Sequence, residues 1–83
     1  MSEVQAIYAK AQTSPNNITF SELCALIEGV GFEFKRQKGS HRIYKHKAIH
    51  YADCLLPVQD RKGNAKPYQV RQVLKIIDSY NLL

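Results

Sequence analysis

The sequence predicts an α+β domain in which a three-stranded antiparallel sheet is covered on one face by helices. Three patterns support this class. Two amphipathic segments early in the chain begin with helix-capping pairs, alternating apolar residues flank a Gly-Ser turn, and a further amphipathic segment follows a proline near the end. The predicted order is helix, helix, three strands, helix. A chain of 83 residues has room for one domain, 1–83, with a modest core.

Capping boxes mark the first two helices. Ser2 with Gln5 precedes a short amphipathic helix over residues 3–12, and Thr19 with Glu22 precedes a second helix with one apolar face. In each box the first side chain accepts a backbone N–H of the first turn, which favours a helix start at that point.

The middle of the chain has the alternation that is typical of strands. We predict a hairpin of residues 32–37 and 40–45 around a turn at Gly39, and a third strand over 54–58. Gly31 is expected to end the preceding helix in the left-handed conformation that glycine tolerates.

The remaining segments are a loop and a last helix. Residues 46–53 favour no single structure, and residues 60–66 have the composition of a polar loop. Pro67 suits a first helical turn, and an apolar stripe then predicts a helix to about Tyr80.

Strand geometry sorts the side chains of the second hairpin strand. His41, Ile43 and Lys45 share one face, and Arg42 and Tyr44 point to the other. If Ile43 packs on the core, His41 lies at the rim of that face beside the turn, where a ligand can reach it.

Positive charge is concentrated in the second part of the chain. Residues 1–34 hold one cation, Lys10, against four glutamates, whereas residues 35–83 hold eleven Lys and Arg against three Asp. The formal net charge is +5. A cluster of this kind favours a polyanionic partner, because phosphate contacts release condensed counterions. The alternative is a solvated basic surface that serves solubility.

His41 is the candidate for chemistry on such a partner. RNA carries its own nucleophile, the 2′-hydroxyl, and an imidazole with a pKa of about 6.5 can accept and donate a proton near neutral pH. Gly39 would permit close approach, and Ser40 offers a hydroxyl and an N–H to phosphate. The cations that would stabilise the transition state are Arg36, Lys38, Arg42 and Lys45. The alternative, which spacing alone favours, is a strand histidine with an ordinary hydrogen bond.

Two further groups of residues suggest weaker sites. Lys62, Lys66 and Arg71 surround the start of the last helix and form a candidate second phosphate contact, or else a solvated positive rim. The other group, His46, His50 and Cys54, recurs every four residues. It lacks a fourth ligand and a Cys-x-x-Cys pair, so we predict no metal site and no bound cofactor.

The cysteines and hydropathy indicate a compartment. Cys24 and Cys54 lie among apolar neighbours, which predicts small buried thiols in a reduced, cytoplasmic protein with no catalytic thiol. No apolar run approaches the ~20 residues of a membrane span, and the N-terminal residues lack the pattern of a secretion signal.

Three stretches resemble one known family. These are Gly31-Phe32, the run from Arg36 through Lys38-Gly39-Ser40 to His41, and the strand end Tyr44-Lys45-His46. Over roughly residues 20–80 the chain is similar to the HicA toxins of bacterial and archaeal type II toxin–antitoxin systems.

The resemblance implies a fold of double-stranded-RNA-binding-domain type and ribosome-independent cleavage of mRNA. It implies that His41 is the catalytic residue, that Gly39-Ser40 is the turn that presents it, and that a HicB antitoxin covers the site. On this basis residues 19–80 form the HicA-like core, and 1–18 form an N-terminal extension that short members lack.

The chain also departs from the family pattern. Many members have a histidine two residues after the third-strand proline, where this chain has Gln59. Many begin the last helix with a Gly-Thr-Leu-like stretch, where this chain has Lys66-Pro67-Tyr68. The second proton-transfer group is therefore unidentified, and Tyr44, His46, a lysine or water could serve.

We therefore predict a metal-independent endoribonuclease toxin with His41 as general acid/base. One alternative is a non-catalytic double-stranded-RNA binder that uses Lys66 on phosphates. Another is a protein-binding adaptor, which would have no salt-dependent affinity for RNA.

Overall fold

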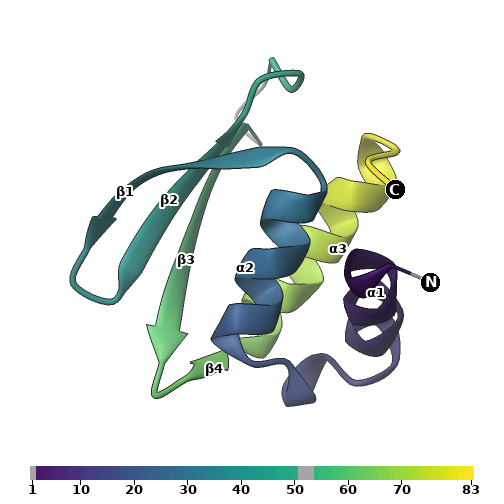
Figure 1. Cartoon of the computed structure of the whole chain (residues 1–83), viewed down its shortest axis with the longest axis vertical. Helices are drawn as coiled ribbons and strands as arrows, with labels where there is room; N and C mark the ends of the chain where they lie inside the picture. The colour runs from purple at the N-terminus through teal and green to yellow at the C-terminus, as the bar shows by residue number, and fades with distance from the viewer. Residues whose placement is uncertain (1, 51–53) are drawn as a thin grey trace.

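The computed structural model describes residues 2–50 and 54–83. The elements in order are α1 (Glu3–Thr13), the 3-10 turn η1 (Pro15–Asn17), α2 (Phe20–Gly29), β1 (Phe32–Lys38), β2 (His41–His46), β3 (Leu55–Arg61), β4 (Asn64–Ala65) and α3 (Pro67–Ser79). The strands form one antiparallel sheet in the order β1-β2-β3-β4. Figure 1 shows the sheet on one side of the molecule and the helices on the other, with α1 farthest from the sheet.

The predicted α+β class and helix order are confirmed, but the sheet has four strands where three were predicted. The fourth, Asn64–Ala65, falls in the predicted polar loop and pairs with the end of β3. A turn between the two strands makes this possible, because Gly63 takes a φ of 87° and donates its N–H to the Asp60 carboxylate at 2.7 Å. A two-residue strand is too short to produce alternation, so the sequence pattern did not predict it.

Both predicted capping boxes are present. The Ser2 hydroxyl accepts the Gln5 N–H, and the Thr19 hydroxyl accepts the Glu22 N–H, with both reciprocal bonds formed. Gly31, just beyond α2, has a φ of 106°, as expected for a glycine after a helix.

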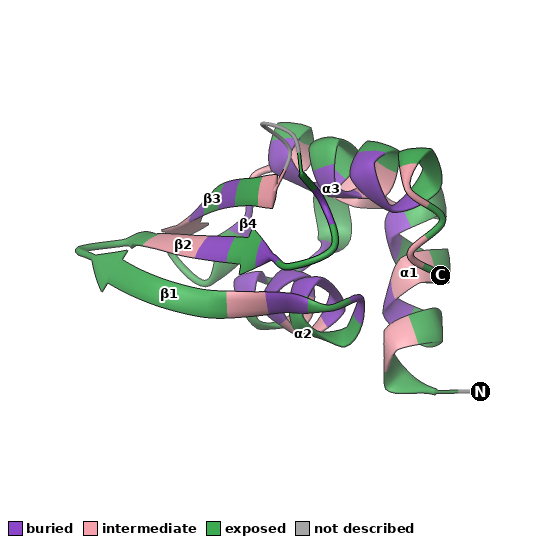
Figure 2. Ribbon diagram, turned by 90° about the horizontal axis from the view of Figure 1, so that it is seen from above, coloured by how far each residue is buried: buried purple, intermediate pink, exposed green. Residues whose placement is uncertain are grey.

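The core lies between the sheet and the helices. Its largest fully buried side chains are Tyr44, Ile18, Leu23, Leu26, Ile27, Leu56, Ile77, Val58, Val70 and Val73. In Figure 2 the buried segments follow the inner sides of α2 and α3 and the middle of β2 and β3, whereas the β1–β2 turn is exposed. The hairpin end of the sheet therefore projects beyond the core.

The core lies on the Tyr44 face of β2, and not on the Ile43 face that was considered from the sequence. Tyr44 is fully buried and its hydroxyl donates to a Glu28 carboxylate oxygen at 2.8 Å, whereas Ile43 is only half-buried and points away from the helices. Alternation alone could not choose, because both faces of this strand offer an apolar side chain. We call the side that carries His41, Ile43 and Lys45 the open face, and the side that carries Arg42, Tyr44 and His46 the covered side.

The hairpin register shifts once. A bulge lies between Phe34 and Arg36, so that Phe34 pairs with Tyr44 and Arg36 pairs with Ile43. Because of the extra residue, the Phe34 side chain lies on the covered side of the sheet and the Arg36 side chain lies on the open face.

Cys24 is buried and Cys54 is half-buried, so the prediction of two buried thiols holds for Cys24 alone. Both thiols are free.

None of the helices in the described part of the chain has the length and hydropathy that a membrane crossing needs. The segment 46–53, which favoured no single structure, ends outside the described residues.

Candidate nucleic-acid interface

Cross-strand pairing brings most of the predicted site residues onto the open face. The rows across β1, β2 and β3 are Lys38–His41–Gln59, Arg36–Ile43–Pro57 and Glu33–Lys45–Leu55. Directly paired residues of antiparallel strands point to the same side of a sheet. Two cations from β1 therefore flank His41 and Ile43 of β2.

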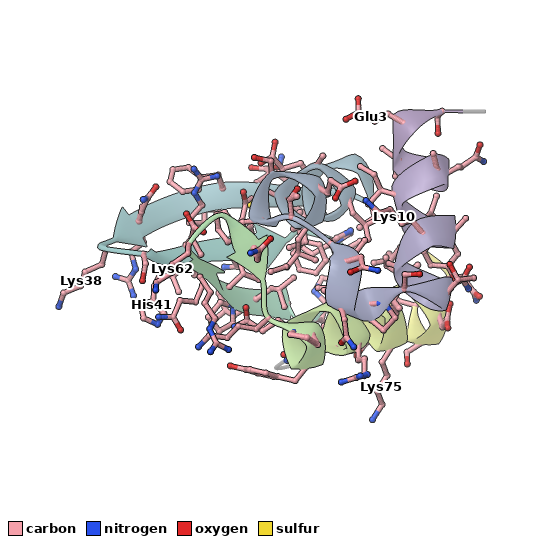
Figure 3. All side chains as sticks on the ribbon, turned by 90° about the horizontal axis from the view of Figure 1, so that it is seen from below. Glu3, Lys10, Lys38, His41, Lys62 and Lys75 are labelled. Atoms are coloured by element: carbon pink, nitrogen blue, oxygen red, sulfur yellow. The ribbon has the colours of Figure 1, made fainter. Side chains whose placement is uncertain are left out.

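The first two rows and the turn enclose a hollow of about 670 Å³. It is lined by Arg36, Lys38, Gly39, Ser40, His41 and Ile43. Five of these six were predicted as site residues. The volume lies in the range of small-ligand sites. In Figure 3 His41, Lys38 and Lys62 lie at the same end of the molecule, away from Lys10 and Lys75.

The charges beside this hollow are available to an anion. The ion pairs found among the described residues use Lys10, Lys35 and Lys47, which bind Glu22 or Glu33. Arg36 and Lys38 are exposed and outside these pairs.

His41 itself is accessible. Its side chain is exposed, and among the residues that the structure describes no hydrogen bond or ion pair occupies the imidazole. The strand fixes its backbone between Lys38 and Gln59. The neighbouring Gly39 has a φ of 60° and open space where a Cβ would be, so a ligand could approach the turn closely.

A polar chain runs from the turn to the start of α3. Gln59, directly across from His41, donates its side-chain N–H to the Ser40 hydroxyl at 3.3 Å and accepts a short hydrogen bond from the Lys66 ammonium. The Gln59 backbone N–H is bound in turn by the buried Gln69 side chain at 3.1 Å. Sequence reasoning placed Ser40 and Lys66 in separate phosphate contacts and missed the glutamine that joins them. The only sign of this glutamine's role in the sequence is that Gln59 stands where many members of the family that the chain resembles have a histidine.

Arg42 lies on the covered side, away from the hollow. Its guanidinium carbon is 5.2 Å from the centroid of the Phe20 ring and 5.9 Å from that of Phe34, and Nη1 is 3.7 Å from the Cys24 sulfur. A hydrogen bond with Tyr44 raises the pKa of the guanidinium. This arginine is a packing residue, and the structure does not bring it together with His41.

His46 is held by the backbone on both sides of its ring. Nε2 lies 3.0 Å from the Val30 carbonyl and Nδ1 accepts the Ala48 N–H at 3.1 Å, so Nε2 carries the proton. Its ring packs edge-on against Phe32. Neither nitrogen is available to a metal or a substrate proton. Within the described residues no group of His, Cys, Asp or Glu side chains could hold a metal ion.

The remaining candidates are dispersed. Lys45 is exposed on the open face four residues from His41, about 13 Å along the strand. Lys62 and Arg71 are exposed, one in the β3–β4 turn and one on α3. Burial raises the pKa of the Cys24 thiol, which disfavours the thiolate that nucleophilic catalysis needs.

A family model described as the HicA toxin of bacterial toxin–antitoxin matches residues 20–78. The matched region begins at the first residue of α2 and includes the sheet, His41 and nearly all of α3, but not α1. Comparisons with curated proteins and with solved structures gave no match. Because the matched region covers more than half of the chain, this chain belongs to the HicA family of toxins.

Proposed function

We propose that this toxin is an endoribonuclease that cleaves mRNA without a metal ion, with His41 as its general acid/base. The observation that carries the proposal is an exposed imidazole in a hollow whose other side chains include Arg36, Lys38 and the Ser40 hydroxyl. These groups are the ones that cleavage by the ribose 2′-hydroxyl requires: a proton acceptor, and donors that stabilise charge on the phosphate.

The reaction would proceed by in-line attack. The 2′-oxygen bonds to the adjacent phosphorus while His41 accepts its proton, and the bond from phosphorus to the 5′-oxygen breaks. The same imidazolium then returns a proton to the leaving oxygen, which gives a cyclic phosphate end and a 5′-hydroxyl end. Arg36, Lys38 and Ser40 would bind the phosphate oxygens throughout. A lysine or water could protonate the leaving oxygen in place of His41, whereas Tyr44 and His46 could not, because both are buried on the covered side.

We propose that this toxin acts in the cytoplasm and that an antitoxin blocks its activity. We infer a HicB-like partner that covers the open face and presents acidic residues to its cations, since complementary charge speeds association and fixes orientation. A pull-down that recovers no acidic partner would contradict this part.

Inducible expression of the native chain and of His41→Ala tests the main proposal. The native chain should arrest growth and degrade mRNA, and the variant should do neither while still binding RNA. Purified toxin should keep cleaving RNA in the presence of a chelator. Activity that stops with the chelator and returns with a divalent ion would overturn metal independence, and an active His41→Ala variant would overturn the catalytic role.

The alternative is a non-catalytic double-stranded-RNA binder with the architecture of that domain class. The exposed Lys62 in the β3–β4 turn and the half-buried Lys66 at the N-cap of α3 favour it as contacts to duplex phosphates. The absence of any cleavage by the native chain, with loss of duplex affinity when these lysines are replaced, would support the binder.

A further inference from the structure

We propose that Tyr68 stacks on an unpaired RNA base next to the cleavage site, so that the substrate is single-stranded RNA. This inference rests on the proposed cleavage at His41 and adds the form of RNA that the site takes. Tyr68 is not among the predicted site residues, and the family match assigns no role to it.

Tyr68 presents an aromatic ring to solvent at the first turn of α3. It is 59% exposed, more than Phe34, Leu55 or Leu83, the other large apolar side chains that are exposed in the described part of the chain. An exposed ring beside cations is the feature with which proteins bind single strands, because every base has a face that can stack.

The ring is held in place by its neighbours. The Lys66 ammonium lies over it, 5.9 Å from the centroid, and the buried Gln69 side chain donates to its hydroxyl at 3.5 Å. A ring whose motion is already restricted by such contacts loses less conformational entropy when a base stacks on it.

Direct contacts connect this ring to the catalytic histidine. Lys66 binds Gln59, which binds Ser40 and pairs across the sheet with His41. Three successive contacts therefore lie between His41 and Tyr68: the pairing of His41 with Gln59, the hydrogen bond from Lys66 to Gln59, and the Lys66 ammonium over the Tyr68 ring. A phosphate bound by Lys66 and Ser40 would lie between them, and a base from the same short stretch of strand would reach the ring.

This arrangement distinguishes single-stranded from double-stranded RNA. In a duplex both faces of each base are already stacked on neighbouring bases, so an exposed tyrosine gains nothing. The phosphate contacts at Arg36 and Lys38, in contrast, are open to either form. Stacking on Tyr68 therefore predicts a preference for single-stranded RNA, which the positive charges alone would not produce.

The test uses His41→Ala protein, so that RNA stays intact, and a short fluorescein-labelled RNA, single-stranded or annealed to its complement. Replacing Tyr68 with Ala should weaken single-strand binding roughly 5- to 150-fold, the contribution of one stacked base. Tyr68→Phe keeps the stacking face and loses only the hydroxyl contact with Gln69, so it should retain most of the affinity that Tyr68→Ala loses. Duplex binding should not change. Phe34→Leu is the matched control, because Phe34 is a comparably exposed aromatic on the opposite edge strand and should leave binding unchanged.

A 2-aminopurine base in the single strand gives a second measurement. Its fluorescence should be quenched on binding to the parent and less so on binding to Tyr68→Ala. Equal losses for single-stranded and duplex RNA, unchanged affinity, or a parent that binds no single-stranded RNA would overturn the inference. So would a Tyr68→Ala variant that loses only antitoxin binding. The proposed function is judged separately, by whether native protein cleaves and His41→Ala does not.

Discussion

Strand β2 begins and ends with a histidine, and the two have opposite surroundings. His46 is 8% exposed with both ring nitrogens hydrogen-bonded to backbone, whereas His41 is exposed beside a hollow with its imidazole unoccupied among the described residues. The two histidines are five positions apart, an odd offset, so they point to opposite faces of the sheet. The side of the strand, and not the residue type, decides which histidine can exchange protons with a ligand.

Alanine replacements should separate the two histidines most strongly. We expect His41→Ala to lower the rate of RNA cleavage by about 10²- to 10⁴-fold, the usual share of general acid–base catalysis, with stability changed by less than about 0.5 kcal/mol. Replacing His46 removes a buried ring and two hydrogen bonds, which should cost about 2–4 kcal/mol of unfolding free energy. Cleavage assays and urea unfolding measure these effects. A His46→Ala protein that is stable but inactive would show that our assignment of roles is wrong.

The two glycines near these histidines extend the contrast. A Cβ at Gly31 would lie 2.7 Å from Nε2 of His46 on a backbone with φ of 106°, so Gly31→Ala should cost about 2–4 kcal/mol. At Gly39 the φ is 60° and a Cβ would meet open space, so Gly39→Ala should cost only about 1–2 kcal/mol. Thermal unfolding of both variants compares them directly. Equal destabilisation would indicate that His46 moves aside freely.

Two arginines on opposite sides of the sheet should respond differently. Arg36→Ala should weaken RNA binding and reduce the slope of log affinity against log salt by about one, as for one lost phosphate contact. Arg42→Ala should instead lower stability by about 1–2 kcal/mol through lost contacts with Phe20 and Phe34, and should leave the salt slope unchanged. Lys75→Ala, remote from the hairpin in Figure 3, is the control for RNA affinity. A reduced salt slope for Arg42→Ala would place that arginine on RNA after all.

The smallest expected effect concerns alkaline pH. Burial, with the neighbouring Cys24 and Glu28, raises the pKa of Tyr44 above its ordinary value near 10. A phenol whose pKa is raised by folding contributes stability that is present below about pH 10 and is lost as the pH rises further. Tyr44→Phe should cost about 0.5–1.5 kcal/mol at neutral pH and make the alkaline decline shallower. Urea unfolding from pH 7 upward would show this, and an unchanged alkaline slope would contradict it.

Local chemistry allowed the helices and the hairpin to be predicted. The capping boxes at Ser2 and Thr19 act within one turn, and Gly31 and Gly39 impose backbone conformations that few other residues adopt. The hollow around His41 follows from the same local geometry, which is why five of its lining residues were predicted.

Tertiary contacts account for what was not predicted. The buried Tyr44 hydroxyl has its partner, Glu28, on α2, and Gln59 has its partner, Lys66, seven residues farther along the chain. Arg42 lies away from the site for a related reason, because it shares a face of β2 with Tyr44 and that face is covered by the core. The division into an extension and a core at residue 19 stays a prediction.

The bulge in β1 affects how copies of this toxin meet one another. β1 is an edge strand, and an edge with a regular row of free N–H and C=O groups invites another strand to join it. Here the row is interrupted between Phe34 and Arg36, and lysine and arginine side chains line the strand. Two molecules brought edge to edge would have mismatched ladders and would repel, so the protein can carry an exposed outer strand and still resist fibrous self-association.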